Sequence, residues 1–289
     1  MEPYEWMVKS TPQTEWIDRR GLLIWLAEVF NGLGGGFYLV SLYLDSLAGM
    51  WISWLIIIVL KGGLHFAYLG RPSRFWRMAA NPRTSWLSRG FIFLGSFIVL
   101  GALQLSASHW LPGTALETAS KMAAGITVFL VVINTGFVMN CINAIPFWNT
   151  ALLPILFISC GILDGFALTL VTGLLGDNME MATAEAASRL LLIVNAFLIT
   201  TYLWSAVYTG PTGKQSVMEI IRGQLSAVLW LGVILCGIVA PFAISIATYI
   251  AAEASPPLLI TAVVLEMVGA FSLKYTILKS ARYSPLIPT

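Results

Sequence analysis

Long apolar segments alternate with short polar ones along almost the whole chain. Eight of them reach about 20 residues, the length of a helix that crosses the hydrocarbon core of a bilayer. These segments span approximately 22–44, 48–69, 90–109, 120–142, 149–175, 186–208, 224–250 and 257–279. The pattern predicts an all-α integral membrane protein, with eight transmembrane helices that cross the lipid membrane in turn.

The composition agrees with this fold class. Of the 289 residues, 58% are hydrophobic and 10% are charged, and a soluble chain of this length cannot bury so much apolar surface in one core. Residues 1–21 show no signal-peptide pattern, so we expect the first helix to be retained. We interpret 1–21 as an N-terminal surface segment and 280–289 as a C-terminal tail. The net charge of +2 gives no indication of a nucleic-acid partner.

Charge is distributed unevenly between the two ends of the predicted helices. Eight spans put both termini on one side, together with the loops 70–89, 143–148 and 209–223. Basic residues dominate this side: Lys9, Arg19, Arg20, five arginines of the loop 70–89, Lys214, Arg222, Lys279 and Arg282. Acidic residues dominate the other: Asp45, Glu117, Asp177, Glu180, Glu185 and Glu253, against Lys121 and Arg189. The positive-inside rule predicts cytoplasmic termini. Docking of an acidic partner on the basic face is the alternative explanation.

The loop 70–89 carries the densest group of charges. Its arginines alternate with aromatic residues and prolines, and Ser73 is placed to cap a short helix over 74–80. Such a loop is either an orientation signal with aromatic anchors or a structured docking surface. We favour docking, because an orientation signal needs no such order. The docking residues that we expect are Arg71, Arg74, Arg77 and Arg89.

Few ionisable groups lie inside the predicted spans, where they are costly and usually functional. Glu28 and Asn31 are three residues apart, and Lys61 and His65 are four apart, so each pair shares a helix face. With a rise of 1.5 Å per residue, these groups and Asn134 fall within roughly 6–15 Å of the basic face. This convergence at one depth predicts a site.

A quinol suits a site of this kind, because it has an apolar tail and a head group that loses two protons on oxidation. We assign proton exchange to Glu28 and His65. Residues assigned to the head group are Asn31, Asn134, Lys61 and Gly35. The alternatives are an ion pair between Glu28 and Lys61, a backbone hydrogen bond for His65, interhelical hydrogen bonds for the asparagines and close helix approach at Gly35.

Two further acids, Asp164 and Glu266, lie near the middle of their predicted spans. They are either stepping stones of a proton path or isolated buried acids that stay protonated. The three cysteines form no C-x-x-C pair, and His65 and His109 lie at opposite ends of their helices. One haem cannot use both histidines. We therefore expect no metal, haem or iron–sulfur cluster in this chain.

Several segments resemble the NrfD/PsrC family, the membrane subunits of polysulfide reductase-like respiratory complexes. LGRPSRFWR at 69–77 and SWLSRG at 85–90 are similar to that family's LGRPxRFWR…SWxxRG signature. NGLGGGFYL at 31–39 resembles its first span. The stretch 134–154, with the turn PFWNT at 146–150, resembles its fourth-to-fifth helix region. Asn134 is a departure, since the family often has tyrosine there.

The resemblance implies a fold and a cofactor. It implies two four-helix bundles, a first over 22–142 that holds the arginine loop and a second over 143–279. Menaquinone or ubiquinone would bind among the first four helices. It also implies a prokaryotic cell membrane as the location.

The resemblance further implies a quinol-oxidising or quinone-reducing subunit of a multi-subunit oxidoreductase. Electrons would be exchanged with a docked four-cluster, ferredoxin-like iron–sulfur subunit. That subunit would serve a catalytic subunit with molybdopterin, so the terminal substrate chemistry lies on another chain. The alternative functions are a secondary transporter or proton channel subunit, which Asp164 and Glu266 allow, and a purely structural anchor. The transporter alternative leaves the arginine loop unexplained.

Overall fold

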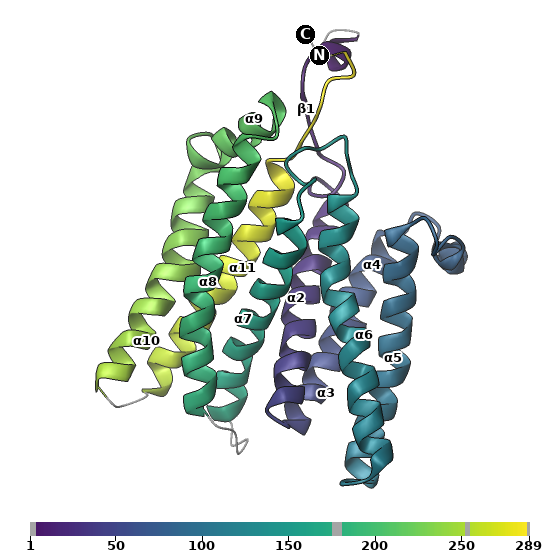
Figure 1. Ribbon diagram of the computed structural model, residues 1–289, viewed down its shortest axis with the longest axis vertical. Coiled ribbons are helices and arrows are strands. Elements are labelled where there is room, and N and C mark those ends of the chain that lie inside the picture. Colours follow the sequence, from purple (N-terminus) through teal and green to yellow (C-terminus); the bar gives the residue numbers. More distant parts are fainter. Residues whose placement is uncertain (1–3, 175–180, 252–254, 288–289) are drawn as a thin grey trace.

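The computed structural model describes residues 4–174, 181–251 and 255–287 and is almost entirely helical (Figure 1). Within these residues, eight helices are long and apolar enough to cross a membrane. They are α2 (Gly21–Tyr43), the second span (Leu47–Tyr68), α5 (Trp86–Trp110), α6 (Ala115–Asn140), α7 (Leu152–Leu174), α8 (Met181–Val207), the seventh span (Val228–Ala251) and α11 (Pro256–Lys279). The all-α, multi-pass prediction is confirmed. Asp177, Glu180 and Glu253, used in the charge comparison, lie outside the described residues.

Polar residues start three of the spans by capping free backbone N–H groups. The Ser46, Ser85 and Thr114 side chains accept hydrogen bonds from the N–H of the residue three positions later, before α3, α5 and α6. A fourth span, α11, begins with Pro256, whose missing N–H costs nothing in a first helical turn.

Two spans change their helical register partway through. The second consists of α3 (Leu47–Leu55), the π-helix η1 (Ile56–Gly62) and α4 (Gly63–Tyr68). The seventh consists of the π-helix η3 (Val228–Val239) and α10 (Ala240–Ala251). Apolar length and periodicity predicted neither change. π-Helical turns are rare and often mark functional sites, and η1 carries Lys61.

The helix α2 lies at the centre, between two groups of helices (Figure 1). One buried apolar cluster joins α2 to α3, α5 and α6, and another joins α7, α8, η3 and α11. Glycines let α2 and α7 touch, since a Cβ on Gly36 would collide with the Gly161 carbonyl oxygen. This arrangement agrees with two bundles, although the boundary at residue 142 stays a prediction.

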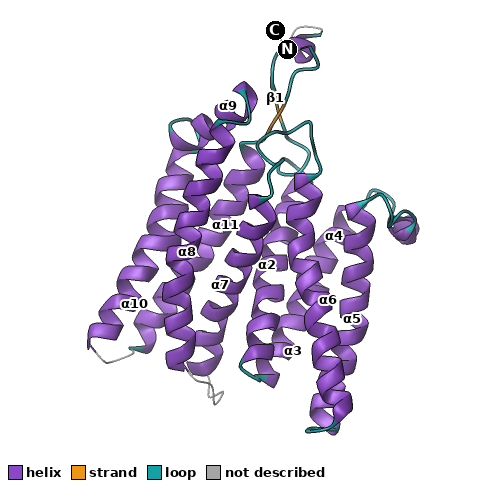
Figure 2. Cartoon of the chain, in the orientation of Figure 1, coloured by secondary structure: helices purple, strands orange, loops and turns teal. Residues whose placement is uncertain are grey.

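Both chain ends lie on the same side as the arginine loop (Figure 2). The strand β1 (Thr11–Pro12) pairs antiparallel with β2 (Arg282–Tyr283), next to the short helix α1 (Glu5–Val8). A surface helix, α9 (Pro211–Ile221), lies in the loop after α8. The arginine loop forms the 3₁₀-helix η2 (Pro72–Ala79). The expected Ser73 cap is wrong, because Pro72 already occupies the first turn and no side chain caps it.

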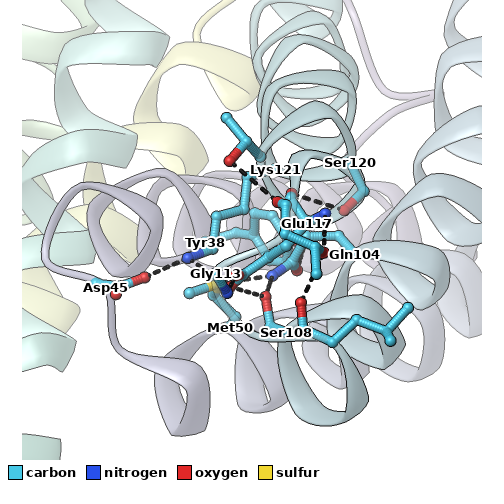
Figure 3. Close-up of polar contacts among 12 residues, drawn as sticks. Tyr38, Asp45, Met50, Gln104, Ser108, Gly113, Glu117, Ser120 and Lys121 are labelled. Atoms are coloured by element: carbon cyan, nitrogen blue, oxygen red, sulfur yellow. Dashed lines mark hydrogen bonds and ion pairs between the residues drawn. The ribbon is translucent and has the colours of Figure 1, made fainter.

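A polar network closes the opposite end of the first bundle (Figure 3). Tyr38 donates to Gln104, whose amide donates to Ser108 at 2.9 Å, and Ser108 donates to Glu117 at 2.9 Å. Lys121 then bridges Glu117 at 2.9 Å and Asp45 at 2.6 Å. These contacts join α2, α5 and α6 on the side away from the arginine loop.

Candidate functional site

Side chains from three spans meet near the basic end of the first bundle. Glu28 and Asn31 come from one face of α2, Lys61 from η1, His65 from α4 and Thr135 from α6. We call these five residues the Glu28 cluster. Four of them were predicted to share a site, and the structure brings these four together.

Asn31 is the centre of the cluster. Its amide nitrogen donates to the Thr135 hydroxyl at 3.1 Å and to the Val131 carbonyl at 3.2 Å. Its amide oxygen accepts a 2.8 Å hydrogen bond from the Lys61 ammonium. Asn31 is 2% exposed and Lys61 7%. Every polar atom of the Asn31 side chain therefore has a partner, which fixes the orientation of the amide.

Glu28 and His65 form a pair at the accessible edge of the cluster. His65 Nε2 lies 3.5 Å from Glu28 Oε1, and the other Glu28 oxygen accepts from Thr135. The His65 side chain is 30% exposed and that of Glu28 is 11% exposed. The expected alternative, an ion pair between Glu28 and Lys61, is not what the described residues form, since Lys61 bonds to Asn31 instead.

The geometry of His65 determines which ring nitrogen faces Glu28. His65 Nδ1 lies 3.2 Å from the Lys61 carbonyl oxygen, which only accepts, so Nδ1 carries a hydrogen. A neutral ring then turns a bare Nε2 toward Glu28. A stable contact needs one more proton, either on the carboxyl group or on the imidazole. Nε2 and the Glu28 carboxyl group therefore face each other 3.5 Å apart, and a proton delivered by a bound ligand can bridge them.

Asn134 lies apart from the cluster. It faces α5, where a Cβ on Gly90 would collide with its amide nitrogen. Asn134 is 9% exposed, and its amide oxygen is buried without a hydrogen-bond partner. Neighbouring residues on a helix point about 100° apart, so Thr135 faces α2 in its place. The polar pair at 134–135 was the only sequence signal for Thr135.

Gly35 also lies outside the cluster. A Cβ there would collide with a Val132 methyl group. The structure thus accounts for Gly35 by close approach of α2 and α6, which was one of its two predicted roles.

The predicted docking arginines fall into two groups. Arg71, Arg74 and Arg77 are exposed on or beside η2. Arg89 is turned inward: it donates to the carbonyls of Pro82 and Arg83, both at 2.8 Å, and its guanidinium lies 4.5 Å above the Trp86 ring. Arg89 therefore shapes the loop rather than presenting its charge outward.

A second polar cluster lies on the other side of α2. Asp164 is 2% exposed, Glu266 is 6% exposed, and each has a carboxyl oxygen without a partner. Both line a cavity of about 30 Å³. Lys274, which sequence reasoning overlooked, is 3% exposed and donates to the Val29 carbonyl of α2 at 3.3 Å. We call Asp164, Glu266 and Lys274 the Asp164 cluster.

Within the described ranges, no group of three or more His, Cys, Asp or Glu side chains is arranged to hold a metal ion.

Comparison with known proteins identifies several relatives. Over 126 residues the chain is 29% identical to a subunit of the sulfite dehydrogenase of Allochromatium vinosum, and the match covers 39% of this chain and 38% of that protein. Over 152 residues it is 26% identical to one chain of the polysulfide reductase of Wolinella succinogenes, covering 50% and 47%. These matches thus span less than half the length of either relative. A longer match, 24% identical over 240 residues, covers 73% of this chain and 74% of protein NrfD of Escherichia coli.

A family model supports the same relationship. Residues 30–284 match the family described as polysulphide reductase, NrfD. This match includes seven of the eight spans completely, the arginine loop and the second polar cluster, and it confirms the resemblance of LGRPSRFWR and SWLSRG. The chain therefore belongs to the NrfD polysulphide reductase family.

Proposed function

We propose that this chain is the quinone-reactive membrane subunit of a respiratory oxidoreductase, which oxidises menaquinol or ubiquinol or works in reverse. The observation that carries the proposal is the Glu28–His65 pair. Its two proton-accepting atoms lie 3.5 Å apart at a partly exposed edge of the cluster, while Asn31 and Lys61 behind it are buried and hydrogen-bonded to each other. This is the arrangement of a general acid–base site.

The residues present suit a quinol head group. A quinol supplies two electrons and two protons when it is oxidised. Glu28 and His65 would take the first proton at the carboxyl oxygen or at Nε2 and release it to water at their exposed edge, and the second proton would leave by the same route. The two electrons would pass to the iron–sulfur subunit. Thr135 and Asn31 would keep Glu28 in place, and Lys61 would hold Asn31. Asn134 stays a candidate for the other side of the head group, because its buried amide oxygen lacks a donor.

The Asp164 cluster supports a proton path through the second bundle. The unpartnered oxygens of Asp164 and Glu266 face one small cavity, and a cavity of this size holds about one water molecule. Glu266 also lines a cavity of about 20 Å³ with Glu185 and Ser188, toward the other membrane surface. The same observation favours the alternative function, a secondary transporter or proton channel subunit.

The basic face would receive the partner subunits. Exposed Arg71, Arg74 and Arg77 would bind an iron–sulfur subunit, which would exchange electrons with a catalytic subunit that carries molybdopterin. Two of the relatives are named as single components of a polysulfide reductase and of a sulfite dehydrogenase, which supports assembly with other chains. The terminal substrate chemistry would then reside on one of those chains.

Quinol-dependent turnover of His65 variants tests the site. We expect His65→Ala to lower turnover by about 100-fold, because the site loses the imidazole that would accept a quinol proton, while the complex still assembles. The matched control is His109→Ala at the opposite end of α5. Wild-type turnover in His65→Ala, or an equal loss in His109→Ala, would refute the site assignment. A transporter would show solute or proton flux in vesicles without any quinol.

Co-purification tests the docking surface. Arg74→Ala/Arg77→Ala should lower the amount of the partner subunits that co-purifies in detergent at low salt, since two exposed charges on one face are lost. Arg189→Ala, at the opposite end of the molecule, is the control. Unchanged co-purification of the loop variant would count against docking there.

A further inference from the structure

The two ends of the chain form a raised structure on the basic face. β1 pairs with β2, with Thr11 opposite Tyr283, and the Ile287 N–H donates to the Met7 carbonyl at 2.8 Å. We call residues 4–12 and 282–287 the paired termini. They extend beyond the ends of the transmembrane helices (Figure 1). A two-stranded pair of this size gains little stability from its own hydrogen bonds.

The paired termini expose large apolar side chains outside the membrane spans. Tyr4 is 70% exposed, Val8 40%, Leu286 66% and Ile287 50%. Lipid tails cover exposed apolar residues on the spans, but not residues that project past the helix ends. Four such side chains on two short neighbouring segments are typical of a surface that a protein partner covers.

The surroundings indicate what kind of partner fits. Exposed cations on this face include Arg19, Arg71, Arg74, Arg77, Arg83, Lys214 and Arg222. The acids Asp18 and Glu219 are paired with Lys279 and Arg282. Among the described residues of this face, Glu15 is an exposed acid without such an ion pair. The charge of the face therefore favours an acidic partner surface.

The paired termini and the arginine loop lie on the same side of the molecule (Figure 2). A cavity of about 580 Å³ is lined by Thr14, Asp18 and Arg19, from the segment that follows β1, and by Tyr68 at the end of α4. The Arg20 guanidinium also donates to the Ala67 carbonyl at 2.9 Å, which ties the base of the N-terminal segment to the end of α4. A partner that rests on η2 can therefore reach the paired termini as well.

We propose that the paired termini are a second docking element, which inserts Leu286 and Ile287 into an apolar pocket of the same soluble subunit that η2 binds. The partner's surface around that pocket is acidic. The proposal rests on the proposed function, in which a subunit docks on the basic face. It adds a contact of a different physical kind, because salt screens the arginine contact and leaves an apolar contact intact.

Salt washing of membranes that contain the whole complex separates the two contacts. At 1 M salt the screening length falls to about 3 Å, so retention of the soluble subunit then depends on the apolar contact. We expect the wild type to retain it at both low and high salt. The variant Leu286→Ser/Ile287→Ser removes the apolar side chains without adding charge. It should keep the soluble subunit at low salt and retain at least about tenfold less of it after the high-salt wash.

Leu111→Ser is the matched control, since Leu111 is an exposed leucine in the turn at the opposite end of α5. Equal retention in wild type and Leu286→Ser/Ile287→Ser at high salt would overturn the proposal. The proposal would also be overturned if this chain alone formed a dimer that the variant dissociates, because the apolar side chains would then contact a second copy of the chain. Binding of a fluorescent quinone analogue, measured on the same membranes, should be equal in both. If the wild type does not bind the analogue, the proposed quinone site is refuted instead.

Discussion

The two polar clusters lie on opposite faces of α2, yet their environments differ. In the Glu28 cluster, Asn31 has a partner for each polar atom, and His65 reaches an exposed edge. In the Asp164 cluster, Asp164 and Glu266 each retain an unpartnered oxygen, and none of its three side chains is more than 6% exposed. One cluster is ordered and accessible, and the other is enclosed and incompletely paired.

This difference separates the roles that each cluster suits. An ordered, partly exposed acid–base pair can meet a ligand that enters from the membrane. A cavity of about 30 Å³ has no room for a head group and admits only water or a proton. The Lys274 ammonium contacts the Val29 carbonyl, one residue from Glu28 but on the other face of α2. A change in α2 therefore affects both clusters, although no side-chain contact between them is needed.

Two matched carboxyl-to-amide variants test the division most strongly. Glu28→Gln removes the proton-sharing acid, so we expect quinol turnover to fall by at least about 100-fold. Asp164→Asn should leave turnover within about threefold of the wild-type rate in membranes treated with a protonophore. In sealed vesicles it should lower the number of protons released per electron. Equal losses of turnover in the two variants would contradict separate roles.

The two buried lysines offer a second comparison of the clusters. Lys61→Met leaves the Asn31 amide oxygen without its donor, and we expect a loss of turnover of about 10- to 100-fold. Lys274→Met should change turnover by about twofold or less, because Lys274 contacts α2 on the face away from the Glu28 cluster. The measurement is quinol turnover normalised to assembled complex. A larger loss of turnover in Lys274→Met than in Lys61→Met would place the quinone site at the Asp164 cluster instead.

Thr135 tests how Glu28 is held. Thr135→Val removes the hydroxyl that donates to Glu28 and accepts from Asn31, so turnover should fall by about 3- to 10-fold. The pH profile of turnover should shift as well, since the Glu28 carboxyl group loses the hydrogen bond from the Thr135 hydroxyl. Thr135→Ser keeps the hydroxyl and should restore both rate and profile. If Ser and Val behave alike, the role of Thr135 is packing.

The smallest effect on turnover is expected at the polar network opposite the site. Gln104 is fully buried and accepts from Tyr38 (Figure 3). Gln104→Leu should reduce the free energy of unfolding by about 1–3 kcal/mol, because the Tyr38 hydroxyl is left unpaired. Thermal melting in detergent and quinol turnover measure the two effects. A large loss of turnover at an unchanged melting temperature would give this network a functional role.

Much of the fold follows from the sequence because a membrane span needs about 20 apolar residues. The eight spans were predicted within a few residues. The π-helices were not, because a register change leaves apolar length unaltered. Pairing of β1 with β2 was also missed, since two-residue strands have no period to detect.

The site was only partly predictable for a related reason. Glu28, Asn31, Lys61 and His65 were found by depth and helix face, which the sequence encodes directly. The rotation of α6 about its axis decides whether Asn134 or Thr135 faces α2. A shift of one residue in the predicted helix face exchanges the two. Lys274 was assigned to neither cluster, because its position near the end of α11 resembles that of an interfacial lysine.

Photolabelling tests the central claim most directly. Membranes that contain the complex are irradiated with a photoreactive quinone analogue, with and without excess quinone, and labelled peptides are mapped by mass spectrometry. The proposed site predicts competed labels on 28–35 and 61–68, which are lost in Glu28→Gln together with turnover. Competed labels confined to α7, α8 or α11 would contradict it.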